Sequence, residues 1–167
     1  MSHYLDREQE MAVWARVMEA RQEPMPDLPD CAPDAKPDCC LTPEQILDWI
    51  CHECHDACLY RHLARCLPRA KQWLLEIAND EQCHAKRLAA QYYLLTGRKP
   101  CFCTHFSPDS HACELLRRQY QEEINGSTAY HDAAHRAEGD LADLLDELSK
   151  DEARHSRMVM CLIECVL

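Results

Sequence analysis

Glycine is scarce in this chain, and long apolar runs are missing. Only 3 of the 167 residues are glycine, and helix-forming residues dominate the rest. This composition predicts an all-α fold. No apolar run approaches the roughly 18 residues that a transmembrane helix needs, so we expect no membrane span. Residues 1–20 lack the pattern of a secretory signal peptide, which favours a cytoplasmic protein.

Positive charge is also in short supply. The chain has 18 Lys and Arg residues against 29 Asp and Glu residues, which gives a formal net charge of −11. Nucleic acids and anionic membranes are both negatively charged, so neither is expected as a main partner. The length suits one domain with a substantial hydrophobic core.

Cysteine, in contrast, is abundant, with 13 residues. The number is odd, an export signal is not evident, and the helices are expected to be long. These features argue against a disulfide scaffold and favour reduced thiols.

The chain divides into an N-terminal part, residues 1–42, and a helical domain, residues 43–167. Residues 5–22 can form an amphipathic helix, because Met11, Trp14, Val17 and Met18 share one side. Five prolines then interrupt residues 23–42, which we interpret as an extended tether that contains three cysteines.

The helical domain is predicted to consist of two helix pairs, residues 43–96 and 108–166. Thr42-Pro43 and Ser107-Pro108 each provide an N-cap followed by proline at the first helical position. Gly97 is well placed to end the second helix, and Gly139 marks the turn inside the second pair. We therefore expect a four-helix bundle.

Two short motifs place a carboxylate and an imidazole one helical turn apart. They are Glu81-x-x-His84 and Glu152-x-x-His155, and an aspartate precedes each of them. Residues at positions i and i+3 lie on the same face of a helix, so the two side chains of each pair can bind the same metal ion.

A second motif lies upstream of each Glu-x-x-His pair. Glu53 is followed seven residues later by Tyr60, and Glu123 is followed seven residues later by Tyr130. The spacing between the two kinds of motif is nearly the same in both halves of the chain. The sequence thus contains an internal repeat of two helices. The two tyrosines are either core aromatics or hydrogen-bond donors to the glutamates.

All of these motifs lie in apolar seams whose residues recur every three or four positions. Four buried carboxylates would strongly destabilise the fold unless they bound protons or cations. Two glutamates plus two Glu-x-x-His pairs form the ligand set of di-iron and di-manganese carboxylate bundles. The predicted metal ligands are Glu53, Glu81, His84, Glu123, Glu152 and His155. Asp80 or Asp151 could accept hydrogen bonds from the imidazoles.

A stripe of cysteine and histidine follows the first helix on the side opposite Glu53. Its members are Cys51, His55, Cys58, His62 and Cys66. It is either a packed helix face, since free cysteine behaves as a small apolar residue, or a second soft-metal or redox site. In the second case Cys31, Cys39 or Cys40 of the tether could complete it.

The paired motifs, with Ala-Asn-Asp-Glu-Gln-Cys-His-Ala-Lys-Arg-Leu around the first and Asp-Glu-Ala-Arg-His around the second, resemble the rubrerythrin branch of the ferritin-like superfamily. The likeness covers about residues 43–167. It implies a four-helix bundle with a crossover between its second and third helices, and a homodimer. It also implies a non-haem di-iron site that reacts with hydrogen peroxide, with Tyr60 and Tyr130 bonded to ligating carboxylates.

The chain departs from the rubrerythrin pattern in two ways. Rubrerythrins have a further glutamate one helical turn after the metal ligand on the third helix, and this chain has Gly126 at that position. The exchange of an iron ligand on oxidation is therefore in doubt. Glu122 is next to Glu123 in the sequence, but its side chain points about 100° away around the helix. A rubredoxin module is also missing, so the electron donor is an external protein such as a rubredoxin, or the chain's own thiols.

The expected function is reduction of peroxide at two iron ions. Alternatives that remain open are a di-manganese or mixed-metal catalase-like enzyme, an oxidase that uses dioxygen, and a non-enzymatic iron-binding or storage protein.

Overall fold

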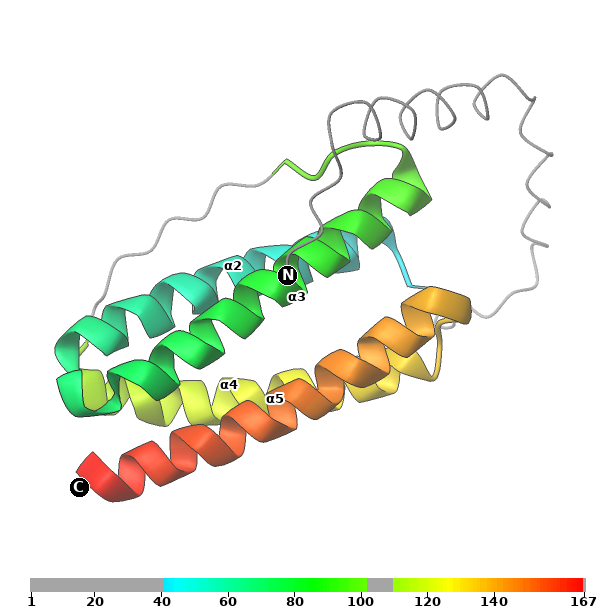
Figure 1. The fold of residues 1–167 in the computed structure, drawn as a ribbon. Helices are drawn as coiled ribbons and strands as arrows, with labels where there is room; N and C mark the ends of the chain where they lie inside the picture. Colours follow the sequence, from blue (N-terminus) through cyan, green and yellow to red (C-terminus); the bar gives the residue numbers. More distant parts are fainter. Residues whose placement is uncertain (1–40, 102–109, 167) are drawn as a thin grey trace, which may run out of the picture. The chain divides into compact units, whose positions relative to one another are not determined.

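A computed structural model describes residues 41–101 and 110–166 of the chain (Figure 1). The predicted N-terminal helix, most of the Pro-rich tether with its three cysteines, and the Ser107-Pro108 pair lie outside these residues. Among the described helices, none combines the length and apolar composition that a membrane span requires.

The described residues form four long helices and one short 3-10 helix, and these parts of the chain contain no strand. The all-α prediction is confirmed. The elements are α2 (Pro43–Cys66), η2 (Pro68–Ala70), α3 (Lys71–Thr96), α4 (Ala112–Ala134) and α5 (Gly139–Val166).

Most helix ends lie where the sequence predicts them. Thr42 and Gln45 form a reciprocal capping box at the start of α2, with Pro43 in its first turn. Gly97 has a φ of 66° and ends α3 in the left-handed conformation that glycine adopts without a steric penalty. Helix α4 begins at Ala112, directly after His111, whose backbone is extended with ψ of 152°. The predicted helix start at residue 108 lies outside the described residues.

The helices associate as two antiparallel pairs. Helix α2 packs on α3, α4 packs on α5, and contacts between α3 and α5 help to join the pairs (Figure 1). One apolar cluster contains the end of α2 and the start of α4, for example Leu63 and Leu116. The other contains Leu88 near the end of α3 together with Tyr130 near the end of α4. Helix α3 therefore ends at the opposite end of the bundle from the start of α4, which makes their connection a crossover.

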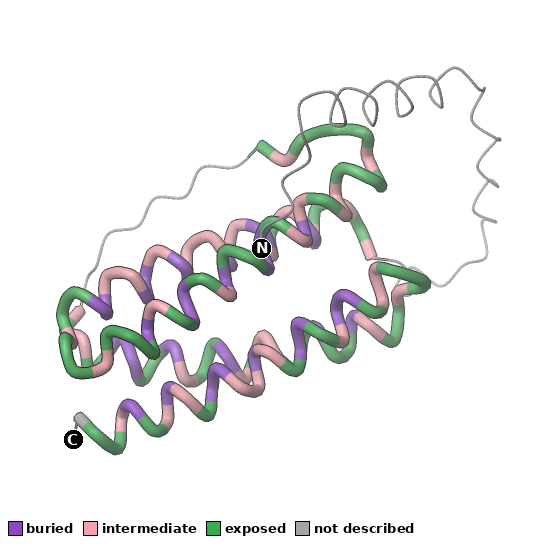
Figure 2. Tube along the Cα trace, viewed as in Figure 1, coloured by how far each residue is buried: buried purple, intermediate pink, exposed green. Residues whose placement is uncertain are grey.

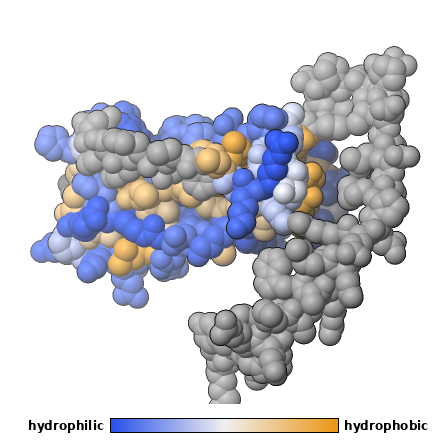
Figure 3. Space-filling model, turned by 90° about the horizontal axis from the view of Figure 1, so that it is seen from above, coloured by the Kyte–Doolittle hydropathy of each residue, from blue (hydrophilic) through white to orange (hydrophobic). Residues whose placement is uncertain are grey.

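Buried positions follow the inward side of each helix along its length (Figure 2). The two apolar clusters occupy the two ends of the bundle, and the predicted metal ligands interrupt them in the middle. On the face seen in Figure 3, hydrophilic residues surround an apolar band that crosses the middle of the described residues. Exposed apolar side chains include Trp73, Leu94 and Leu95.

Candidate metal centre

Each of the four helices contributes acidic or imidazole side chains to one buried polar cluster. Glu53 lies on α2 and Glu123 on α4, while α3 and α5 each provide a Glu-x-x-His pair. Glu123 is 1% exposed and His155 is 0% exposed. The six side chains that the sequence predicts as metal ligands are therefore all buried at the same level of the bundle: Glu53, Glu81, His84, Glu123, Glu152 and His155.

Their donor atoms form two overlapping groups. One consists of Glu53, Glu81, His84 and Glu152, and the other of Glu81, Glu123, Glu152 and His155. Within each group the atoms lie within 4.8 Å of one another, which is close enough to hold a metal ion. Glu81 and Glu152 belong to both groups. They are thus placed to act as shared carboxylates between two ions, with one histidine for each ion.

The surroundings of His84 suit a cation better than a proton. Its Nδ1 atom lies 3.2 Å from a carboxylate oxygen of Glu53, of Glu81 and of Glu152. A single N–H group donates well to only one acceptor at a time, so it cannot satisfy all three oxygens. A metal ion among these four atoms would bind all of them at once.

The surroundings of His155 lead to the same conclusion. Its Nδ1 atom approaches Oε1 of Glu81 to 2.8 Å and Oε2 of Glu123 to 3.5 Å. These three atoms and Oε1 of Glu152 are nevertheless buried without a hydrogen bond of acceptable geometry. Leaving buried polar atoms unsatisfied costs roughly 1–3 kcal/mol for each group, and more for charged ones. The donor set therefore fits a pair of divalent or trivalent ions.

The outer nitrogens of the two histidines face aspartates of the opposite motif. Nε2 of His84 is 3.3 Å from Oδ2 of Asp151, and Nε2 of His155 is 3.4 Å from Oδ2 of Asp80. An N–H at Nε2 that points to a carboxylate leaves the Nδ1 lone pair directed into the cluster, as a metal ligand requires.

Arg154 connects the two aspartates, and the sequence analysis missed it. Its Nη2 atom lies 2.7 Å from Oδ2 of Asp80 and 3.3 Å from Oδ1 of Asp151. The signal was available, because Arg154 is three residues after Asp151 and therefore on the same helix face. One guanidinium group thus holds both acceptors of the histidine N–H groups in place.

The two tyrosines are paired in the same reciprocal manner. The hydroxyl of Tyr60 on α2 donates to Oε1 of Glu123 on α4, and the hydroxyl of Tyr130 on α4 donates to Oε1 of Glu53 on α2. Both tyrosines are buried. These hydrogen bonds fix one oxygen of each carboxylate and leave the other oxygen directed towards the cluster.

Burial and close neighbours shift the pKa values of the clustered carboxylates and imidazoles. Burial raises the pKa of Glu81 to about 8, and burial together with Glu81 raises the pKa of Glu152. Burial by itself would lower the pKa of His155, but the nearby carboxylates of Glu123 and Glu81 have the larger effect and raise that pKa to about 10. Burial also acts to raise the pKa of Glu123, but His155 outweighs it and the net shift is downward. The metal-free cluster therefore retains protons that a bound cation would displace.

The cysteine and histidine stripe on α2 is separate from this cluster. Cys51 and Cys58 are half-buried, and Nε2 of His62 lies 3.4 Å from Sγ of Cys66. Among residues 41–101 and 110–166, the only groups of three or more potential ligands are the two described above. The tether cysteines that could complete a second site lie outside those ranges, so that site stays a prediction.

A pocket of about 450 Å³ opens between α2 and α4 and reaches the carboxylates of Glu53 and Glu152. Gly126 and Asp56 also line it. Asp56 lies three residues after Glu53, as Gly126 lies three residues after Glu123, so the two occupy the same position in the internal repeat. Gly126 stands out in the sequence as a departure from the rubrerythrin pattern, whereas Asp56 was not predicted as a site residue. Glu122 lies exposed along the same pocket.

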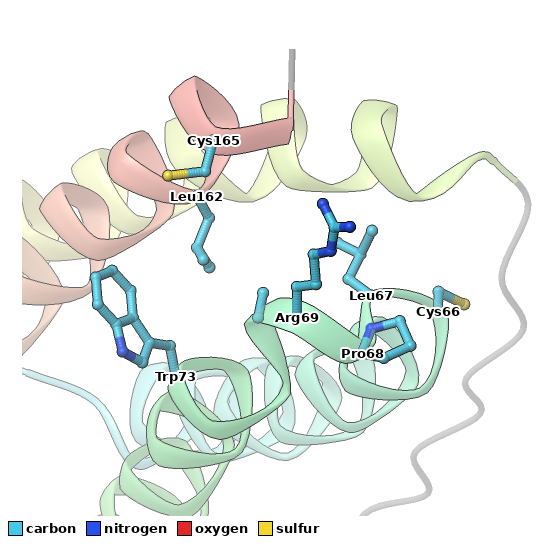
Figure 4. Close-up of a pocket in the computed structure, with 8 residues that line it drawn as sticks. Cys66, Leu67, Pro68, Arg69, Trp73, Leu162 and Cys165 are labelled. Atoms are coloured by element: carbon cyan, nitrogen blue, oxygen red, sulfur yellow. The ribbon is translucent and has the colours of Figure 1, made fainter.

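A pocket of about 680 Å³ at the end of the bundle lacks comparable chemistry (Figure 4). Leu67, Trp73 and Leu162 are among the residues that line it, and no carboxylate or imidazole does. The thiols of Cys66 and Cys165 at this pocket point in different directions (Figure 4). Of the two pockets, only the one between α2 and α4 opens onto the candidate metal centre.

Comparison with protein-family models, with curated proteins and with solved structures gives no match for this chain. The function is therefore inferred from the geometry of the cluster.

Proposed function

We propose that this chain is a di-iron carboxylate protein of the rubrerythrin type, within the ferritin-like superfamily, that reduces hydrogen peroxide. The observation that carries the proposal is the sharing of Glu81 and Glu152 between two four-residue donor groups. Shared carboxylates suit two ions that act together on one small molecule, and a single-ion site would not need them.

The chemistry of the donors favours iron or manganese. The cluster offers carboxylate oxygens and imidazole nitrogens but no thiolate, which is the donor set of non-haem iron and manganese sites. Two bound iron ions would supply the two electrons that cleavage of an O–O bond requires.

The protein's own residues would prepare the site for that reaction. Tyr60 and Tyr130 orient Glu123 and Glu53 through their hydroxyl groups. With the proton on Nε2, Asp80 and Asp151 would accept hydrogen bonds from the histidines and leave each Nδ1 atom free to bind a metal. The apolar clusters close the site towards both ends of the bundle. The pocket between α2 and α4 provides the path from the surface, which favours an enzyme over a storage protein.

In this proposal the active protein is a homodimer, and the electrons come from an external protein such as a rubredoxin. Its alternatives are a di-manganese or mixed-metal catalase-like enzyme, an oxidase that uses dioxygen, and a non-enzymatic iron-binding protein. They differ in metal content and in the need for reductant.

The test is anaerobic loading with Fe²⁺, followed by elemental analysis and peroxide turnover with and without a chemical reductant. We expect about two iron ions per chain and peroxide loss that depends on reductant. Evolution of dioxygen without reductant would identify a catalase. Iron uptake without turnover would identify a binding protein, and less than one ion per chain would contradict all of these functions.

Variants in the shared carboxylates sharpen this test. Glu81→Gln should lower the bound metal below one ion per chain, because both positions lose a ligand. Glu164→Gln on the exposed side of α5 is the matched control and should retain both ions. Retention of two ions by Glu81→Gln would contradict the shared role.

A further inference from the structure

The pocket between α2 and α4, here called the α2–α4 pocket, is much larger than hydrogen peroxide requires. A water molecule occupies about 30 Å³ in the liquid, and hydrogen peroxide is only slightly larger. The pocket volume of about 450 Å³ therefore leaves room for an organic group in addition to a peroxide group. Its inner end is formed by Glu53 and Glu152, both members of the donor group that contains His84.

A difference between the two halves of the internal repeat opens the pocket at its inner end. The repeat position that is Asp56 on α2 is Gly126 on α4. A Cβ atom at residue 126 would lie 3.3 Å from Oε2 of Glu152. Any larger side chain at this position would therefore crowd Glu152 and fill the space in front of it. Glycine leaves that carboxylate accessible from the pocket.

The walls of the pocket combine an apolar surface with charges of both signs. Trp49, Leu59 and Ala129 provide apolar contact, and the ring of Trp49 packs edge-on against Tyr130 with centroids 5.2 Å apart. Arg118 and Glu122 also line the pocket. Among the charged residues of the wall, Asp56 and Glu122 outnumber Arg118, so an organic anion gains no net attraction there and a neutral molecule is favoured.

We propose that the α2–α4 pocket binds a neutral organic hydroperoxide, with its organic group against Trp49, Leu59 and Ala129 and its peroxide group towards Glu152. This rests on the proposed function. Reduction of ROOH breaks its O–O bond, takes up two electrons and two protons, and releases ROH and water. The metal pair, when bound, would supply the electrons, and solvent would supply the protons. The external donor then returns the two electrons.

The test compares cumene hydroperoxide with hydrogen peroxide as substrates of the iron-loaded full chain. We expect kcat/KM for cumene hydroperoxide to be at least comparable with that for hydrogen peroxide. Ala129→Leu extends a side chain into the pocket from an exposed position on α4. It should lower the ratio of the two kcat/KM values by about tenfold, which is about 1.4 kcal/mol. Thr128→Leu adds the same side chain at a neighbouring position outside the pocket lining and should leave the ratio unchanged.

Binding of the product supplies a readout that does not depend on turnover. Cumyl alcohol should bind the full chain in a calorimetric titration, and Ala129→Leu should weaken this binding about tenfold while Thr128→Leu does not. If hydrogen peroxide is reduced but cumene hydroperoxide is not, the pocket proposal is wrong and the proposed function stands. If neither is reduced, the proposed function fails. Absence of alcohol binding, or equal binding by both variants, overturns the pocket proposal in either case.

Discussion

Asp151 on α5 lies 3.3 Å from Nε2 of His84 on α3, although it belongs to the motif that contains the other histidine. The reciprocal pair is Asp80 with Nε2 of His155, at 3.4 Å. Each Glu-x-x-His motif thus depends on the aspartate of the opposite helix pair. The polar contacts that can orient the candidate metal ligands therefore also join the two helix pairs.

Removing either aspartate should therefore weaken metal binding without unfolding the bundle. We expect Asp80→Asn and Asp151→Asn each to reduce metal affinity about 10- to 100-fold, because the histidine loses the acceptor that fixes its tautomer. A competition titration with a chelator of known affinity measures the effect. Asp143→Asn, on an exposed face of α5, is the control. Equal affinities for all three variants would show that the aspartates do not orient the histidines.

The hydroxyls of Tyr60 and Tyr130 should contribute measurably to stability. Each donates to a buried carboxylate, and hydrogen bonds to charged groups contribute roughly 1.5–3 kcal/mol. Tyr60→Phe and Tyr130→Phe should each lower the free energy of unfolding of the full chain by about that amount, as measured in urea. Tyr120→Phe removes a hydroxyl at the edge of an apolar cluster and should have a smaller effect. A change below about 0.5 kcal/mol in both buried variants would contradict the role of these bonds.

Much of this arrangement could be predicted from the sequence, because helical periodicity is a local property. Glu53, Glu81 and the other candidate ligands each interrupt an apolar seam, and spacing alone places them at one depth. The helix ends at Pro43 and Gly97 follow from equally local capping rules. The start of α4 at Ala112 offers no such signal, because His111 provides no side-chain cap.

Contacts between helices were harder to predict. Arg154 binds Asp80 from a different helix pair, and Asp56 faces a pocket that exists only once α2 and α4 are placed. Spacing within one helix contains no information about the partner helix. The stripe that includes Cys51 and Cys58 shows the same limit, since a repeated residue type does not reveal what completes a site.

The metal-free protein should become less stable as pH rises from about 6 to 9. The pKa of Glu81 is raised to about 8 and that of His155 to about 10, so both groups bind protons more tightly when folded than when unfolded. Their contribution to stability is complete below the unfolded pKa values and is lost as pH rises through the folded values. Glu123, whose pKa is lowered, has the opposite effect, but only in acid.

Urea unfolding of the metal-free chain at several pH values measures this loss. The slope should reach about 1.4 kcal/mol per pH unit for each proton released. Glu81→Gln should flatten the slope between about pH 6 and 8, because a neutral amide replaces the titrating carboxyl. The metal-loaded chain should show little slope there, since the cations replace the protons. A metal-free protein whose stability rises over this range would contradict the assignment.

Gly126→Ala should change the stability of the metal-free bundle and its affinity for metal in opposite directions. Residue 126 lies within α4 at a backbone conformation open to any residue, so alanine gains up to about 1 kcal/mol of helix propensity. The added Cβ lies 3.3 Å from Oε2 and 3.5 Å from Cγ of Glu152, which must move by a few tenths of an ångström. In the metal-free chain that side chain can adjust. In a loaded chain it would be held as a carboxylate shared by two ions.

We therefore expect Gly126→Ala to raise the free energy of unfolding of the metal-free chain by about 0.5–1 kcal/mol, and to lower metal affinity by about tenfold. Thr128→Ala, on the exposed side of α4, also gains propensity but does not approach Glu152, so it should leave metal affinity unchanged. Urea unfolding and chelator competition on the same samples give both quantities. If Gly126→Ala binds metal as tightly as the natural chain, the space beside Glu152 is not required by the metal site. The glycine would then serve only to open the pocket.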